Sequence, residues 1–284
     1  MVGQSQTSAE RQFLMARMSD PAPGSPLPSR IPMWLWCLPA ALLVLTAPLW
    51  LHVWEPGMFL AINALCTPVP TALWAGLSLL GNAWGVLGLT APLLVLAPRL
   101  LWAWLCATPF AIVFARVGKA LIESPRPAAV VDNDQMRVVG ELLHNVSMPS
   151  GHTLTAFAVA AGLYFALPVV GRWRHAWLWG LAAGTGLSRI AVGAHWPGDV
   201  AVGACLGLLA GLLGQSLLAR IGQQHMQAQA WSLRAVALLI AVAAYHLASE
   251  GLDFAEALPT QRVVAIIAVL SLLVFVRQSA KPAG

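Results

Sequence analysis

Charged residues are scarce in this sequence, and their scarcity limits the class of protein it can encode. Only 10% of the 284 residues are Asp, Glu, Lys or Arg, whereas 58% are hydrophobic and the mean hydropathy is +0.73. A soluble domain of this size needs a more highly charged surface. Since one crossing takes roughly 20 apolar residues, the chain has material for about six to eight membrane helices. We therefore expect an all-α fold, a polytopic membrane helix bundle.

Cysteine is also rare, and metal-ligand spacings are missing. The four cysteines lie far apart, mostly within apolar runs, where small buried residues are expected, and the seven histidines show no HExxH spacing. We predict no metal and no cofactor. The net charge of +5 does not indicate a nucleic acid partner, because the basic residues are scattered among hydrophobic segments. The cysteines are Cys37, Cys66, Cys106 and Cys205.

The apolar runs divide the chain into three parts. Residues 1–30 are polar and rich in Ser, Pro and Arg, which predicts a disordered cytoplasmic N-terminus. Residues 31–222 are expected to form the membrane core, and residues 223–284 an additional C-terminal helix pair. That pair could be a regulatory or assembly element, could line a lipid entry groove, or could simply add packing to the bundle. Expected spans are 31–54, 83–97, 100–122, 151–170, 176–194, 197–218, 232–248 and 262–276, with short interfacial helices between 55 and 82.

The distribution of Lys and Arg predicts the orientation. With eight spans, the basic N-terminus, Arg99, the 172–174 loop, the 220–234 connector and the C-terminus fall on one side. Cytoplasmic ends carry this excess of positive charge. The opposite side, where the acidic loops lie, then faces the exterior, or the periplasm if the chain resides in a bacterial inner membrane.

The stretch Ser188–Asp199 places a cation, an imidazole and a carboxylate within mostly hydrocarbon sequence. Charges near a bilayer are costly unless a polar cavity receives them, so the stretch is a candidate site. Gly193 and Pro197 predict a helix, a turn and a second helix. Asp199 would lie in the first turn of the second helix and accept a hydrogen bond from His195. An imidazole held in one tautomer is a good nucleophile or base.

Two other polar segments lie at span ends on the same predicted side. One carries Lys119 and Arg126, and the other reads Pro149-Ser150-Gly151-His152. Ser150 is expected to be an N-cap, and the amides after it, with the helix dipole, favour an anion. Cations, imidazoles and an anion site are what a metal-free phosphate ester hydrolase needs. These residues alone leave open whether His195 or His152 is the nucleophile.

The three segments together resemble the three-part signature of the type-2 phosphatidic acid phosphatase superfamily, which includes vanadium haloperoxidases and glucose-6-phosphatase. The match runs from residue 119 to residue 199 without a departure at a motif position. The resemblance implies a six-helix core with an outward-facing site, and metal-independent hydrolysis of phosphate monoesters or pyrophosphates. The matching motifs are Lys119-x6-Arg126-Pro127, Pro149-Ser150-Gly151-His152 and Ser188-Arg189-x5-His195-x3-Asp199.

The resemblance also implies a role for each residue. His195 would attack phosphorus to form a phosphohistidine, with Asp199 orienting it. His152 would protonate the leaving oxygen and then activate water. The phosphoryl oxygens would be held by Lys119, Arg126, Arg189, the Ser150 hydroxyl and the Gly151 amide.

A membrane-embedded site favours a lipid substrate, because acyl chains can stay in the bilayer while the head group enters. Candidates are undecaprenyl pyrophosphate, phosphatidylglycerol phosphate, phosphatidic acid and lipid A, and the sequence does not choose among them. It does not predict an oligomeric state either. A lipid phosphotransferase and a non-catalytic lipid-binding protein are alternatives, although a binding protein has no need for both His152 and His195.

Overall fold

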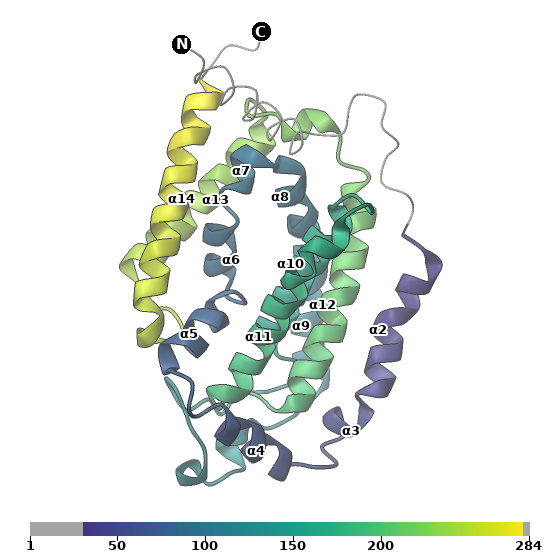
Figure 1. Cartoon of the computed structure of the whole chain (residues 1–284), viewed down its shortest axis with the longest axis vertical. Coiled ribbons are helices and arrows are strands. Elements are labelled where there is room, and N and C mark those ends of the chain that lie inside the picture. The colour runs from purple at the N-terminus through teal and green to yellow at the C-terminus, as the bar shows by residue number, and fades with distance from the viewer. Residues whose placement is uncertain (1–30, 281–284) are drawn as a thin grey trace, which may run out of the picture.

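The computed structural model describes residues 31–280, and all regular secondary structure within that range is helical. Figure 1 shows the long helices running lengthwise side by side in one bundle. The predicted all-α membrane bundle is therefore confirmed, whereas the expected disordered tail, residues 1–30, lies outside the described residues. The helices are α2 (Met33–Leu45), α3 (Ala47–Trp50), α4 (Gly57–Leu65), α5 (Thr71–Leu79), α6 (Ala83–Leu89), α7 (Leu93–Leu96), α8 (Pro98–Leu105), α9 (Thr108–Leu121), α10 (Gly151–Ala166), α11 (Trp177–Ala191), α12 (Pro197–Leu218), α13 (Trp231–Ser249) and α14 (Leu258–Ser279).

Within residues 31–280, four helical stretches are long and apolar enough to cross a membrane, or five if the bent pair α5 and α6 counts as one span. That is fewer than the eight predicted spans, because several apolar runs are interrupted. The run 83–97 breaks into α6 and α7 next to Pro92, and the run 151–170 leaves the helix at Leu167, just before Pro168. The four stretches are Pro98–Leu121, Pro197–Leu218, Gln223–Ser249 and Ala255–Ser279.

Helix α12 lies very close to α10, and glycines allow this distance. Gly203, Gly207 and Gly211 recur at every fourth position, so they share one face of α12. A methyl group on Gly203 would come within 2.7 Å of the Ser150 carbonyl oxygen. One on Gly207 would overlap the Leu154 carbonyl. Such small-residue faces let membrane helices approach backbone to backbone, and here they hold the starts of α10 and α12 together.

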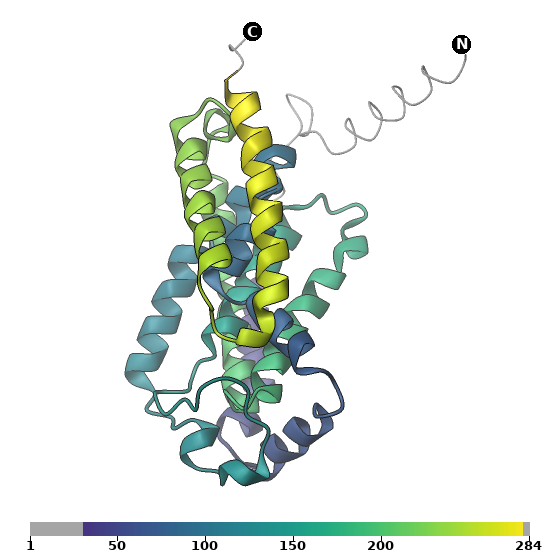
Figure 2. The same ribbon diagram turned by 90° about the vertical axis from the view of Figure 1, so that its left-hand side faces the viewer.

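The last two helices form an antiparallel pair, which stands in front of the bundle in Figure 2. Leu233 and Ile240 of α13 and Phe275 of α14 are buried in a cluster with Leu101 of α8. The loop between α13 and α14 returns to the start of α10, where Asp253 contacts His152. The C-terminal pair therefore touches one of the predicted site residues.

Candidate active site

The three polar segments meet at the end of the bundle where α11 gives way to α12, the lower end in Figure 1. Arg126 contacts His195, and the Ser150 amide donates to the Asp199 carbonyl oxygen over 3.0 Å. Lys119 interacts electrostatically with Arg126 and Asp199. Residues from all three segments thus form one cluster.

His195 lies in the connection between α11 and α12, and Asp199 lies in the first turn of α12. Helix α11 ends at Ala191 and α12 begins at Pro197, with Gly193 between them at φ +79°. A side chain on Gly193 would also meet the Arg137 carbonyl oxygen at 2.7 Å, so glycine is required there. The turn brings Nδ1 of His195 within 3.2 Å of Oδ2 of Asp199, as the spacing predicted. Their side chains are only 2% and 0% exposed.

Arg126 determines which nitrogen of His195 carries the proton. Its Nη1 lies 3.3 Å from Nε2 of His195. Because a guanidinium only donates hydrogen bonds, Nε2 must accept, and the ring proton is then on Nδ1, facing Asp199. The Arg126 side chain is itself held, since Nε donates to Asn145 Oδ1 at 2.6 Å and Nη1 donates to the Ala194 carbonyl at 2.8 Å. The Nε2 lone pair therefore faces a fixed cation.

The carboxylate of Asp199 accepts hydrogen bonds from two donors that the sequence did not indicate, the Ser147 hydroxyl and the Trp196 amide. The Ser147 hydroxyl donates to Oδ2 in a very short hydrogen bond, and it also lies 3.3 Å from Nδ1 of His195. The Trp196 amide donates to the same oxygen at 2.9 Å. Ser147 is one serine in a long polar loop, and nothing in its local sequence distinguishes it from the others. The fold alone brings it to Asp199.

Arg189 contacts two residues that the sequence did not indicate. Its Nη1 donates to the Ser78 hydroxyl, and its guanidinium lies over the Phe254 ring, 5.4 Å from the centroid. The side chain is 4% exposed, and within residues 31–280 its Nε has no hydrogen-bond partner. A buried donor of this kind is available to an anion.

The start of α10 differs in one respect from the prediction. Ser150 occupies the N-cap position, but its side chain makes no capping hydrogen bond. Its hydroxyl instead accepts from Thr153 Oγ1 at 2.9 Å, because that neighbouring donor lies within reach. The Ser150 proton can still be donated. Gly151 follows as the first helical residue, and Nε2 of His152 lies 3.0 Å from Oδ2 of Asp253 rather than in contact with His195.

Burial lowers the pKa of His195 to about 3, since the charged imidazolium is disfavoured away from water. Asp199 opposes this shift, while Arg126 and Arg189 add to it. For Asp253 burial acts to raise the pKa of the carboxyl group, but its hydrogen bonds from His152 and Asn82 outweigh burial and hold the pKa well below the ordinary value. His195 is thus neutral and Asp253 is ionised at neutral pH.

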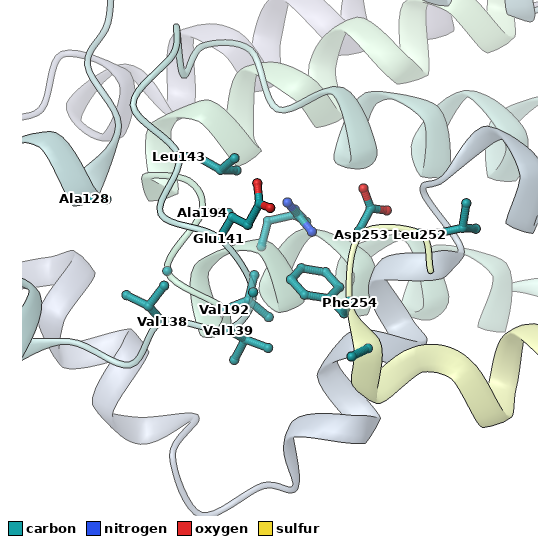
Figure 3. Close-up of a pocket in the computed structure, with 14 residues that line it drawn as sticks. Ala128, Val138, Val139, Glu141, Leu143, Val192, Ala194, Leu252, Asp253 and Phe254 are labelled. Carbon is teal, nitrogen blue, oxygen red and sulfur yellow. The ribbon is translucent and has the colours of Figure 1, made fainter. Parts of the chain in front are cut away.

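A cavity of about 410 Å³ opens beside this cluster (Figure 3). Arg189 and Ala194 border it on the motif side, and Asp253 and Phe254 border it on the side of the C-terminal pair. Within residues 31–280 no group of three His, Cys, Asp or Glu residues could hold a metal ion. The four cysteines are free, and Cys37 is exposed, contrary to the expectation that all four are buried. The other residues around the cavity are Ala128, Val138, Val139, Gly140, Glu141, Leu143, Val192, Gly193, Leu252 and Ala255.

Comparisons with known proteins agree with the motifs. Residues 100–222 match the PAP2 superfamily. A lipid A 1-phosphatase from Porphyromonas gingivalis is 43% identical over 68 residues, 24% of this chain and 15% of the relative. The bacitracin transport permease protein BcrC of Bacillus licheniformis is 33% identical over 101 residues, 35% of this chain and 46% of the relative. This chain therefore spans less than half the length of either relative.

A solved structure gives a similar result for the fold. The crystal structure of Aquifex aeolicus LpxE superposes with a TM-score of 0.50 at 26% identity, covering 56% of this chain and 93% of that one. The superposition, the matched segment and the motif set agree with one another. Residues 100–222 of this chain, less than half of its length, resemble the PAP2 superfamily.

Proposed function

We propose that this protein is a lipid phosphate or pyrophosphate phosphatase that works without a metal through a phosphohistidine intermediate. One observation carries the proposal. His195 is buried and neutral, its Nδ1 proton faces Asp199, and its Nε2 lone pair faces the cation Arg126. A nucleophile held in one tautomer beside a group that binds phosphoryl oxygens suits phosphoryl transfer.

The first step forms a bond between Nε2 of His195 and phosphorus while the bond to the leaving oxygen breaks. His152 gives its proton to that oxygen, and Asp199 stabilises the positive charge that develops on the ring of His195. In the second step His152 takes a proton from water, the water oxygen bonds to phosphorus, and the bond to Nε2 breaks. Inorganic phosphate leaves and the free imidazole returns.

The anion would be held by the motif groups gathered at this end of the bundle. Arg126 and Lys119 provide positive charge, and Arg189 provides its unpartnered Nε. The hydroxyl of Ser150 and the amide of Gly151, at the start of α10, complete the set. In this proposal the donors surround the phosphorus of the bound substrate and neutralise negative charge on its oxygens as it develops.

The substrate class follows from the membrane setting and from one relative. A multi-pass bundle with a site at one end can leave acyl chains in the bilayer while it admits a phosphorylated head group. The lipid A 1-phosphatase relative makes a lipid A 1-phosphate the first substrate to try, followed by undecaprenyl pyrophosphate, phosphatidylglycerol phosphate and phosphatidic acid. We propose that the site faces the periplasm or exterior, because the distribution of Lys and Arg favours that side.

The test is phosphate release from this panel by detergent-purified protein, with a chelator present, comparing wild type with His195→Ala. We expect release by the wild type and none by the variant, and quenching in alkaline denaturant should trap label on the wild type in a base-stable form that acid then releases. A wild type that stays folded yet releases no phosphate from any of the lipids would rule the proposal out. Chelator sensitivity would contradict the metal-free mechanism, and label appearing on a second lipid would identify a phosphotransferase.

A further inference from the structure

We propose that Asp253, in the loop between α13 and α14, is a positioning residue for His152, so that the C-terminal helix pair completes the catalytic site. The inference rests on the function proposed above, in which His152 is the general acid and base. Asp253 lies outside residues 100–222, the segment that matches the superfamily.

The carboxylate of Asp253 receives two hydrogen bonds on one oxygen. Oδ2 lies 3.0 Å from Nε2 of His152 and accepts from Nδ2 of Asn82 at 2.9 Å. Asn82 is itself fixed, because its Oδ1 accepts from the Trp84 amide at 3.0 Å as the N-cap of α6. The side chains of His152 and Asp253 are 21% and 33% exposed, so the pair is partly shielded from water. The carboxylate thus has a defined position rather than the freedom of a surface side chain.

The residue after Asp253 anchors the loop. Phe254 is 6% exposed, packs in a cluster with Val139 and Ala194, and lies under the guanidinium of Arg189. Gly140, at φ +77°, faces the same ring, and a methyl group there would come within 3.1 Å of it. The loop is therefore clamped against the motif segments.

The turn between α5 and α6 is fitted equally closely to His152. A methyl group on Gly81 would come within 2.5 Å of the His152 carbonyl oxygen and 2.7 Å of its Cβ. Only glycine lets the turn approach this far, and the approach brings Asn82 into reach of Asp253. Two separate elements thus converge on His152 at the start of α10: the α5–α6 turn and the α13–α14 loop.

This geometry assigns the two ring nitrogens of His152. With Nε2–H held by Asp253, Nδ1 is the atom that can carry the catalytic proton and release it. The charged groups facing His152 are Asp253, Arg189 and Arg126, while α9 and α12, which also pack on α10, contribute Lys119 and Asp199 to the site. Burial and the two neighbouring arginines lower the pKa of His152, whereas the Asp253 carboxylate at 3.0 Å opposes that shift. Asp253 therefore helps keep His152 in the acid form that the first step requires.

The experiment compares Asp253→Asn with wild type on two substrates, an alkyl lipid phosphate and an aryl phosphate such as p-nitrophenyl phosphate. General acid catalysis is worth about 10²–10⁴ in rate, so we expect kcat for the alkyl ester to fall about 10- to 100-fold with little change in KM. The kcat for the aryl ester should fall much less, because its leaving group needs little protonation. The basic limb of the pH–rate profile should also move to lower pH. Glu256→Gln, which removes an exposed acidic group from the same loop, is the matched control.

An equal loss on both substrates with an unmoved pH profile would show a merely structural role and overturn the inference. Asp253→Glu keeps the charge but displaces it, and it should show a smaller loss with the same leaving-group dependence; it replaces Asp253→Asn if that variant does not fold. In His152→Ala, adding Asp253→Asn should cost nothing further, because the residue acts through His152.

The two proposals fail in different ways. An active wild type, an inactive His195→Ala and an unaffected Asp253→Asn would reject the role of Asp253 alone. An inactive wild type, or a His195→Ala variant as active as wild type, would reject the phosphatase mechanism and this inference with it.

Discussion

Nη1 of Arg126 lies 3.3 Å from Nε2 of His195, across 69 residues of sequence. The contact identifies Nε2 as the ring atom free of a proton, and it places a cation where phosphoryl oxygens would arrive. The nucleophilic atom and part of its anion site are therefore set by one pair of side chains.

Arg126→Lys tests this pair. Lysine is a single point charge and cannot reproduce the separate bonds to Asn145, Ala194 and His195, so we expect kcat/KM to fall by about 10²-fold or more although the charge is conserved. Arg174→Lys, in the loop before α11, is the control. Steady-state kinetics on the best lipid substrate would measure the difference, and activity within a factor of about two of wild type would contradict the assigned role.

Ser147→Ala removes a donor from the carboxylate of Asp199. Leaving a buried acceptor short of a partner costs about 1–3 kcal/mol, and the looser carboxylate should orient His195 less well. We expect a lower melting temperature together with a drop in kcat. Ser249→Ala, on the exposed end of α13, should change neither. A Ser147→Ala variant with normal turnover would show that the Trp196 amide alone suffices to hold Asp199.

Two glycine-to-alanine substitutions should change the stability of the protein in different directions. Gly180→Ala in α11 has open space around the new methyl group, and alanine favours a helix over glycine by about 1 kcal/mol, so stability should hold or rise. Gly207→Ala places the methyl group within 2.7 Å of Phe157 Cβ and against the Leu154 carbonyl, which should cost about 1–3 kcal/mol. Thermal unfolding in detergent measures both. A Gly207→Ala protein as stable as Gly180→Ala would refute the close α10–α12 contact.

The low pKa of His195 predicts a specific response to acid. With a folded-state value of about 3 against an ordinary value of 6.5, the ring takes up a proton in the unfolded chain but not in the folded one as pH falls below the ordinary value. The free energy of unfolding should therefore decrease as the pH falls below the ordinary value. The folded ring should stay neutral between about pH 7 and pH 5. Nitrogen NMR of labelled histidine, with the His195 signal identified by its loss in His195→Gln, reports the ring directly. A protonation midpoint near that of free histidine would contradict the buried environment.

Local sequence was sufficient for features that depend on neighbours along the chain. The spacing of His195 and Asp199, with Gly193 before them and Pro197 between them, predicted the turn and the hydrogen bond that the structure contains. The apolar runs predicted the membrane bundle. The roles of the site residues in catalysis stay predictions, as does the boundary near residue 222.

Tertiary structure decided what depends on distant segments. Ser147, Ser78, Asn82 and Asp253 carry no local signal, since each acquires its partner only when separate helices pack; His152 and Asp253 are 101 residues apart in sequence. Span ends were misjudged where proline interrupts the helix, whereas at Ser150 the helix start was right and only the capping hydrogen bond differs. Sequence alone thus determined the membrane class and the reactive residue types. The packing of α10, α12 and the C-terminal pair decided which of those groups touch, because hydrogen bonds are short-range and only close-packed backbones hold remote side chains within that range.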